Sequence, residues 1–111
     1  FVKNYKARYG QDRVTDDPIE AAYNAVYLWA AAVEKAGTTD VNAVRKAAAG
    51  ISIDSPEGKI TIDGENQHVY KTVRIGQVNK DGLIDQVWAS DGPIKPDPYL
   101  KGYDWAKGLA S

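Results

Sequence analysis

The sequence predicts an α+β fold, with helices in the first half of the chain and antiparallel strands in the second. Before residue 50, apolar residues recur at helical spacing behind capping residues, whereas β-branched residues between turn residues dominate after it. Lys80, Asp81 and Gly82 separate the last two extended runs, and an Asp-Gly pair is typical of a tight hairpin turn. Helices followed by antiparallel strands form an α+β arrangement.

Two short helices are expected on either side of a longer one. Aromatic residues recur every four positions over residues 1–9, and Gly10 follows them, which indicates the end of an amphipathic helix. Asp40 can cap a second run of good helix formers over residues 41–49. The chain is therefore expected to be helical at both ends of its first half.

The central helix has the clearest start signal. Asp17 can cap it, Pro18 suits the first helical position, and Glu20 would complete a capping box. Its apolar spacing continues to Gly37, so we predict a helix over about residues 18–36. The expected buried stripe consists of Ile19, Ala22, Tyr23, Val26, Ala30 and Val33.

The second half of the chain contains four extended runs, at residues 51–53, 60–62, 69–78 and 83–89. The first two are too short to form a stable sheet alone, so we expect them to pair with strands outside this chain. Prolines then predict an irregular surface strap over residues 91–111. The expected parts are helical residues 1–50, a strand hairpin region 51–90 and this strap.

Composition excludes several functional classes. Fourteen basic and fifteen acidic residues give a net charge of -1, so no positive field favours nucleic acid. The longest apolar run, residues 25–33, is far shorter than the roughly 20 residues of a membrane span. Without cysteine, disulfides and thiol nucleophiles are excluded. Because the chain begins at Phe1 and contains no methionine, we expect a processed or truncated product.

The order of these features resembles the branched-chain amino acid and amide receptors of ABC importers. The helical part of the resemblance lies in residues 16–29, 32–37 and 41–49. Residues 55–63 and 65–68 are similar to the Gly-containing strand of the family and the loop after it. Within the family, residues 66–68 and 90–99 are most similar to the urea receptors. The resemblance covers nearly the whole chain.

This resemblance implies a type I periplasmic binding fold, in which two α/β lobes close over a small solute and deliver it to a membrane permease. It identifies the chain as the C-terminal fragment of such a receptor, in the periplasm or on the extracellular face of a bacterial membrane. The implied ligand is urea or a short-chain amide. A branched-chain amino acid receptor of the same fold and an amide-sensing regulatory protein are the alternatives. The resemblance implies no enzyme activity, catalytic residue, metal or cofactor.

Asp16 and Asp17 are the first candidates for ligand contact, because carboxylates accept hydrogen bonds and urea presents four donors and one acceptor. Capping explains Asp17 completely, so Asp16 is the stronger candidate. In the amino acid receptors, an aromatic residue near the start of this helix contacts the ligand. Alignment on Tyr23 places that position near Pro18, where this sequence has no aromatic residue. Either Pro18 and Ile19 approach a smaller solute, which makes Pro18 a further candidate, or the contact is absent.

Two further groups have competing interpretations. Tyr23 could present its hydroxyl to a cleft together with Tyr27, although their helical spacing favours packing in the core. His68 lies beside acidic residues, but one histidine without calcium-loop spacing favours a turn. A hydrolase is a further hypothesis, and only carboxylates support it. The sequence contains no nucleophile elbow and no zinc signature. These carboxylates are Asp16, Asp17, Glu20, Asp63 and Glu65.

Overall fold

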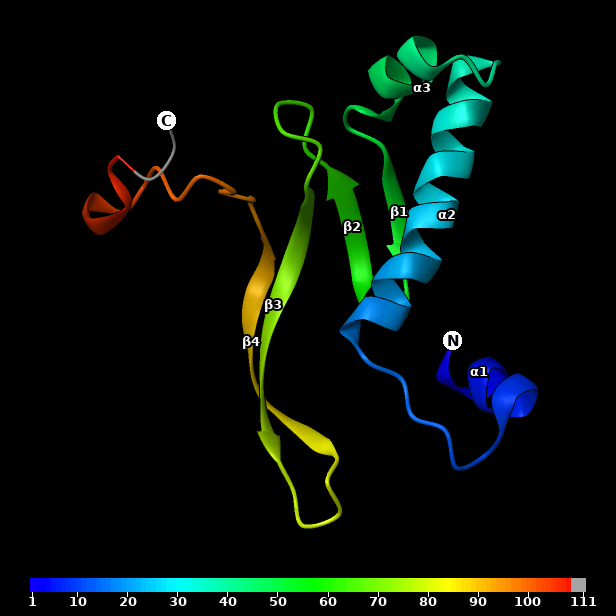
Figure 1. Ribbon diagram of the computed structural model, residues 1–111, viewed down its shortest axis with the longest axis vertical. Coiled ribbons are helices and arrows are strands. Elements are labelled where there is room, and N and C mark those ends of the chain that lie inside the picture. The colour runs from blue at the N-terminus through cyan, green and yellow to red at the C-terminus, as the bar shows by residue number, and fades with distance from the viewer. Residues whose placement is uncertain (109–111) are drawn as a thin grey trace.

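The computed structural model describes residues 1–108 and confirms the α+β prediction, with helices followed by antiparallel strands (Figure 1). The helices are α1 (Val2–Tyr9), α2 (Asp17–Ala36) and α3 (Val41–Ala48). The strands are β1 (Ser52–Ser55), β2 (Gly58–Ile62), β3 (Val69–Val78) and β4 (Ile84–Ile94), and a short 3-10 helix follows at Asp104–Ala106.

The strands form one antiparallel sheet in the order β1-β2-β3-β4. β1 pairs with β2, so that Ile53 lies opposite Ile60, and β2 pairs with the beginning of β3. The expectation that the short strands pair with strands outside this chain is therefore wrong. A tight turn makes the local pairing possible, because the Ser55 hydroxyl donates to the Gly58 carbonyl at 2.7 Å and Gly58 adopts a φ of 115°.

β4 is longer than the sequence indicates, because it continues through the first residues of the expected strap. Pro93 lies opposite Thr72 and Ile94 lies opposite Lys71. β4 is an edge strand, and an edge or a bulge tolerates a residue without an amide donor. The ladder shifts register here, and the Val73 amide donates to the Ser90 hydroxyl at 3.0 Å. The strap prediction is therefore wrong for residues 91–94, and residues 109–111 lie outside the described part.

The buried face of α2 differs from the predicted stripe. Its buried residues are Glu20, Asn24, Leu28 and Ala32, which recur every four positions and so share one face. The helix packs against α3 and β1. Val26, by contrast, is 63% exposed, and Tyr23 and Ala22 are exposed too. The helix is apolar around most of its circumference, so the neighbouring elements, and not the apolar spacing, decide which face is buried.

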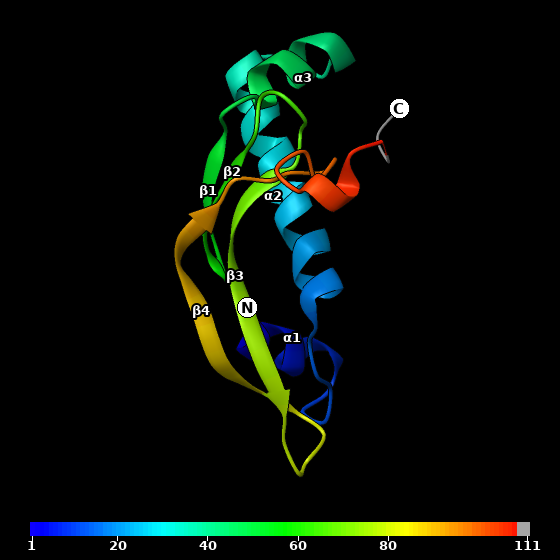
Figure 2. The same cartoon turned by 90° about the vertical axis from the view of Figure 1, so that its left-hand side faces the viewer.

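The molecule is extended for its length. β3 and β4 form a long curved ribbon that runs along most of the molecule (Figure 2). α2 lies beside β1, at the edge of the sheet opposite β4 (Figure 1). The radius of gyration is 16.9 Å, whereas about 13 Å is typical of a compact domain of this length. The apolar core of the described residues is correspondingly small, with Leu28, Ala32, Ile60 and Ala106 as its buried members.

Candidate functional site

The two aspartates at the start of α2 have different roles from those that the sequence predicts. Asp16 is the N-cap, since its backbone is extended and its Oδ1 accepts the Ile19 amide at 2.9 Å. Asp17 is the first helical residue, so the prediction that it caps the helix is wrong. The expected capping box is also absent, because Glu20 turns inward and its Oε1 accepts a hydrogen bond from the side-chain Nδ2 of Asn24 at 2.6 Å.

Three carboxylates meet beside this helix start. Asp17 and Glu20 come from α2, and Glu57 comes from the turn between β1 and β2. One carboxylate oxygen from each lies within 4.8 Å of the others. Glu20 is only 9% exposed, so its charge is removed from most of the solvent. We call Asp17, Glu20 and Glu57 the carboxylate trio.

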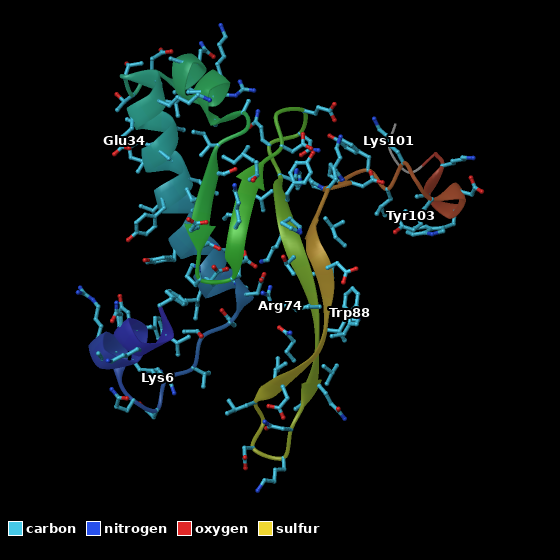
Figure 3. The ribbon with its side chains drawn as sticks, turned by 180° about the vertical axis from the view of Figure 1, so that it is seen from behind. Lys6, Glu34, Arg74, Trp88, Lys101 and Tyr103 are labelled. Atoms are coloured by element: carbon cyan, nitrogen blue, oxygen red, sulfur yellow. The ribbon has the colours of Figure 1, made fainter. Side chains whose placement is uncertain are left out.

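Two cations of β3 contact this trio. The Lys71 Nζ lies 2.5 Å from Asp17 Oδ1 and 3.1 Å from Glu57 Oε2, so that it bridges two elements. Arg74 donates from its guanidinium to the main-chain carbonyl of Glu57 at 3.0 Å. In Figure 3, Arg74 lies on the side of β3 that faces the start of α2. The site therefore combines several acceptors with two donors.

The pKa values reflect this crowding. Burial raises the pKa of Glu57 above its ordinary value, Lys71 opposes the rise, and neighbouring Glu20 adds to it. For Lys71, burial acts to lower the pKa, but its hydrogen bonds to Asp17 and Glu57 outweigh burial and raise it. Lys71 is therefore held firmly in its charged form.

These residues line a pocket of about 610 Å³ between the start of α2, the β1–β2 turn and β3. Asp16 and Asp17 both line it, so the structure brings together two of the predicted ligand contacts. Pro18 is not among the lining residues and is exposed. The remaining lining residues are Phe1, Val2, Thr15, Glu20, Pro56, Glu57, Lys71, Thr72, Val73 and Arg74.

Tyr23 lies apart from this pocket. Its hydroxyl donates to the Tyr27 hydroxyl at 3.2 Å, and its ring lies 4.9 Å from the ring of Phe1. Both tyrosines are exposed, so the prediction that they pack in the core is wrong for the described part of the chain. Tyr23 instead lines a second pocket of about 350 Å³ together with Asn24 and Asp54.

The His68 turn agrees with the sequence interpretation. The His68 amide donates to Asn66 Oδ1 at 2.9 Å, and the Glu65 amide donates to Asp63 Oδ1 at 2.7 Å. The acidic side chain of Asp63 is thus used in closing the turn. These bonds give a structural role to the residues that had suggested a metal site.

The important residues that sequence reasoning missed are Glu57, Lys71 and Arg74. Lys71 lies within an apolar run that predicts a strand, and it is half-buried. A half-buried charged residue needs an ion-pair or hydrogen-bond partner. That was a usable signal for an ion pair. The identity of the partner was not available, because Lys71 and Asp17 are 54 residues apart in the chain.

Two comparisons with known proteins match most of this chain. The periplasmic binding protein domain family matches residues 1–104. The limonene hydroxylase of Geobacillus stearothermophilus is 36% identical over 100 residues, which cover 90% of this chain and 18% of that protein. No helix among the described residues is long and apolar enough to cross a membrane. Because the family matches nearly the whole chain, this protein belongs to the periplasmic binding protein domain family, a family of ligand-binding receptors.

Proposed function

We propose that this chain is the C-terminal part of an extracytoplasmic receptor that binds urea or a short-chain amide and delivers it to the permease of an ABC importer. The observation that supports the ligand class is the pocket at the start of α2. It contains the carboxylate trio beside Lys71 and Arg74. Urea presents four N–H donors and one carbonyl acceptor, so acceptors in excess beside a few donors complement it.

The pocket has room for more than a urea molecule and opens on the surface of this chain. We therefore propose that a second lobe supplies the remaining wall and closes over the solute. The chain spans 18% of the curated relative, which is consistent with a fragment of a longer polypeptide. In this proposal, residues 1–50 are its helical part, and the strand part extends from residue 51 to the end of β4 at Ile94. The C-terminal strap begins after Ile94.

We further propose that the chain has no catalytic role. The hydroxylase named above shares 18% of its length with this chain. We place any hydroxylation in the part of that protein outside the shared segment.

Two related functions use the same fold. A branched-chain amino acid receptor would need groups for an ammonium and a carboxylate, and the net negative pocket disfavours the carboxylate. An amide-sensing regulator would bind the same solute but pass the signal to a partner protein. Permease and ATPase genes beside the full-length gene would favour transport over sensing.

The experiment is a calorimetric titration of the full-length polypeptide that contains this chain, with urea, acetamide and leucine at micromolar concentration. We expect saturable binding of urea or acetamide and none of leucine. Asp17→Asn should weaken this binding by about tenfold, the value of one hydrogen bond to a charged group. Asp81→Asn, at the tip of the β3–β4 hairpin, is the matched control and should bind like the wild type. Leucine binding without amide binding would refute the ligand assignment.

A further inference from the structure

The pocket of about 350 Å³ between α2 and β1 contains a buried hydrogen-bond acceptor without a donor. Asn24 lines this pocket and is 3% exposed. Its side-chain Nδ2 donates to Glu20 Oε1 at 2.6 Å, which fixes the amide so that Oδ1 points away from Glu20. This buried Oδ1 has no hydrogen-bond partner within residues 1–108. Because most buried polar groups are hydrogen-bonded, the oxygen indicates a donor that the described chain does not supply.

The open edge of β1 borders the same pocket. The Ile62 amide donates to the Ile51 carbonyl at 2.8 Å, and hydrogen-bonded pairs alternate along an antiparallel ladder. The main-chain groups of Ile53 therefore point to β2, whereas those of Ser52 and Asp54 point away from it. β1 is an edge strand, so the N–H and C=O of these two residues form no hydrogen bond within the described part of the chain.

Aromatic rings line the pocket beside these polar groups. The ring of Tyr23 lies 4.8 Å from that of Tyr27 and 4.9 Å from that of Phe1. Ile53 and Pro56 add apolar surface from the β1–β2 side. The volume lies near the lower end of the range of roughly 300–1,000 Å³ that is usual for small-ligand pockets. Apolar walls around a few polar groups are typical of such pockets.

We propose that this pocket binds a short, neutral peptide in an extended conformation, which adds to the open edge of β1. An extended residue presents an N–H and a C=O with the spacing of those of Asp54, so the two residues can exchange two hydrogen bonds. A further N–H of the peptide can donate to Asn24 Oδ1. β1 has four residues, of which Ser52 and Asp54 point outward, so two or three peptide residues cover its edge.

This pocket contains none of the carboxylate trio, so the inference goes beyond the proposed function. The probe is a trialanine peptide with an acetylated N-terminus and a methylamide C-terminus, which is neutral and can pair through its main chain. Titrated at low millimolar concentrations into the full-length polypeptide, it should bind saturably and shift the amide resonances of Ser52 and Asp54. Saturating urea should leave this binding unchanged.

A change in the peptide and a change in the protein test the pairing separately. The same peptide with its central amide N-methylated lacks one donor and should bind at least about tenfold more weakly. Asp54→Pro removes the outward N–H, which an edge strand tolerates, and should also weaken binding about tenfold. Asp54→Ala keeps the N–H and is the matched control, which should bind like the wild type. Should Asp54→Pro fail to fold, the two peptides compared in the wild type decide the question.

The outcomes separate this site from the pocket at the start of α2. Equal binding of the two peptides by the wild type would overturn the inference. Slow hydrogen exchange of the Ser52 and Asp54 amides without peptide would show that another segment of the full-length polypeptide covers the edge, and would refute it too. Competition by urea would place the peptide in the other pocket and refute this site. Peptide binding as expected, without binding of urea or acetamide, would support this site and overturn the proposed ligand alone.

Discussion

Two adjacent aspartates at the start of α2 have different physical roles. Asp16 accepts the Ile19 amide and so satisfies one of the free donors at the helix start. Asp17, one residue later, has no capping bond and directs its carboxylate to Lys71. The same residue type thus serves the helix at one position and the pocket at the next.

The cap gives a prediction about stability. Asp16→Ala should destabilise the protein by about 1 kcal/mol, because the Ile19 amide loses its acceptor. Asp17→Ala removes the ion pair with Lys71, in which the Asp17 side chain is largely exposed. This substitution should lower the free energy of unfolding by less than about 1 kcal/mol. Thermal unfolding of both variants checks this order. A larger cost for Asp17→Ala would contradict the assignment of the cap.

A second prediction concerns pH. Asp97 accepts the Lys101 and Gly102 amides at 3.0 and 3.2 Å. These backbone hydrogen bonds, that of Gly102 first, lower the pKa of Asp97 below 3.8. Because the folded-state pKa is lowered, the stabilisation is present above pH 3.8 and is lost as the pH falls through the folded-state value.

The amide chemical shifts of Lys101 and Gly102 should therefore change together below pH 3.8, and Asp97→Asn should abolish that change. Unchanged titration in the variant would mean that another group produces the effect.

Among the elements, the β3–β4 hairpin depends on one close approach. A Cβ added at Gly76 would lie 2.2 Å from Ile84 Cγ2 and 3.5 Å from the Asp85 carbonyl oxygen. The register also shifts between Ile75 and Gly76, where β4 carries one more residue than β3. Because Gly76 has no side chain, the Ile84 side chain can occupy the space that a Cβ at position 76 would fill.

Gly76→Ala should destabilise the hairpin by about 1–2 kcal/mol, the cost of forcing a side chain out of its place. Adding Ile84→Ala should remove most of that cost, because the nearest remaining side-chain atom, the Ile84 Cβ, would be 3.7 Å away. Gly92→Ala, with no atom within 4 Å of the added Cβ, is the control. Hydrogen exchange of the β3 amides measures all three. Additive effects of the two substitutions would contradict the close approach.

At the scale of the whole molecule, the chain exposes more surface than a self-sufficient domain. Its accessible surface is 8435 Å², whereas about 6,000 Å² is typical of a compact monomer of 12.1 kDa. Much of this surface is apolar, including Val26 and Trp29 on α2 and both Ile75 and Trp88 on the hairpin. Such surface is typical of segments that are covered by other parts of a protein.

The chain expressed alone should therefore bind a hydrophobic dye and unfold at a lower temperature than the same residues within the full-length polypeptide. In the proposed full-length receptor, burial of these exposed apolar side chains would supply the additional stability. Dye fluorescence and calorimetry of the two proteins test this. A cooperative, dye-free transition of the isolated chain at the full-length temperature would show that it is a complete domain.

Much of the fold could be predicted because its signals are local. Capping residues, the spacing before Gly37 and the turn around Gly82 each act over a few positions, so the order of helices and strands follows from the sequence. For the site, the sequence indicated Asp16 and Asp17 but not their partners. Glu57 and Lys71 join them only through long-range packing.

The sequence by itself therefore determined the α+β order, the capped start of α2, the absence of a net positive charge and the resemblance to periplasmic binding receptors. The tertiary structure alone decided which face of α2 is buried, how far β4 extends and which charges meet in the pocket. The physical reason is the range of the interactions. Caps and turns depend on neighbouring residues, whereas burial and ion pairing depend on elements that meet only after the chain has folded.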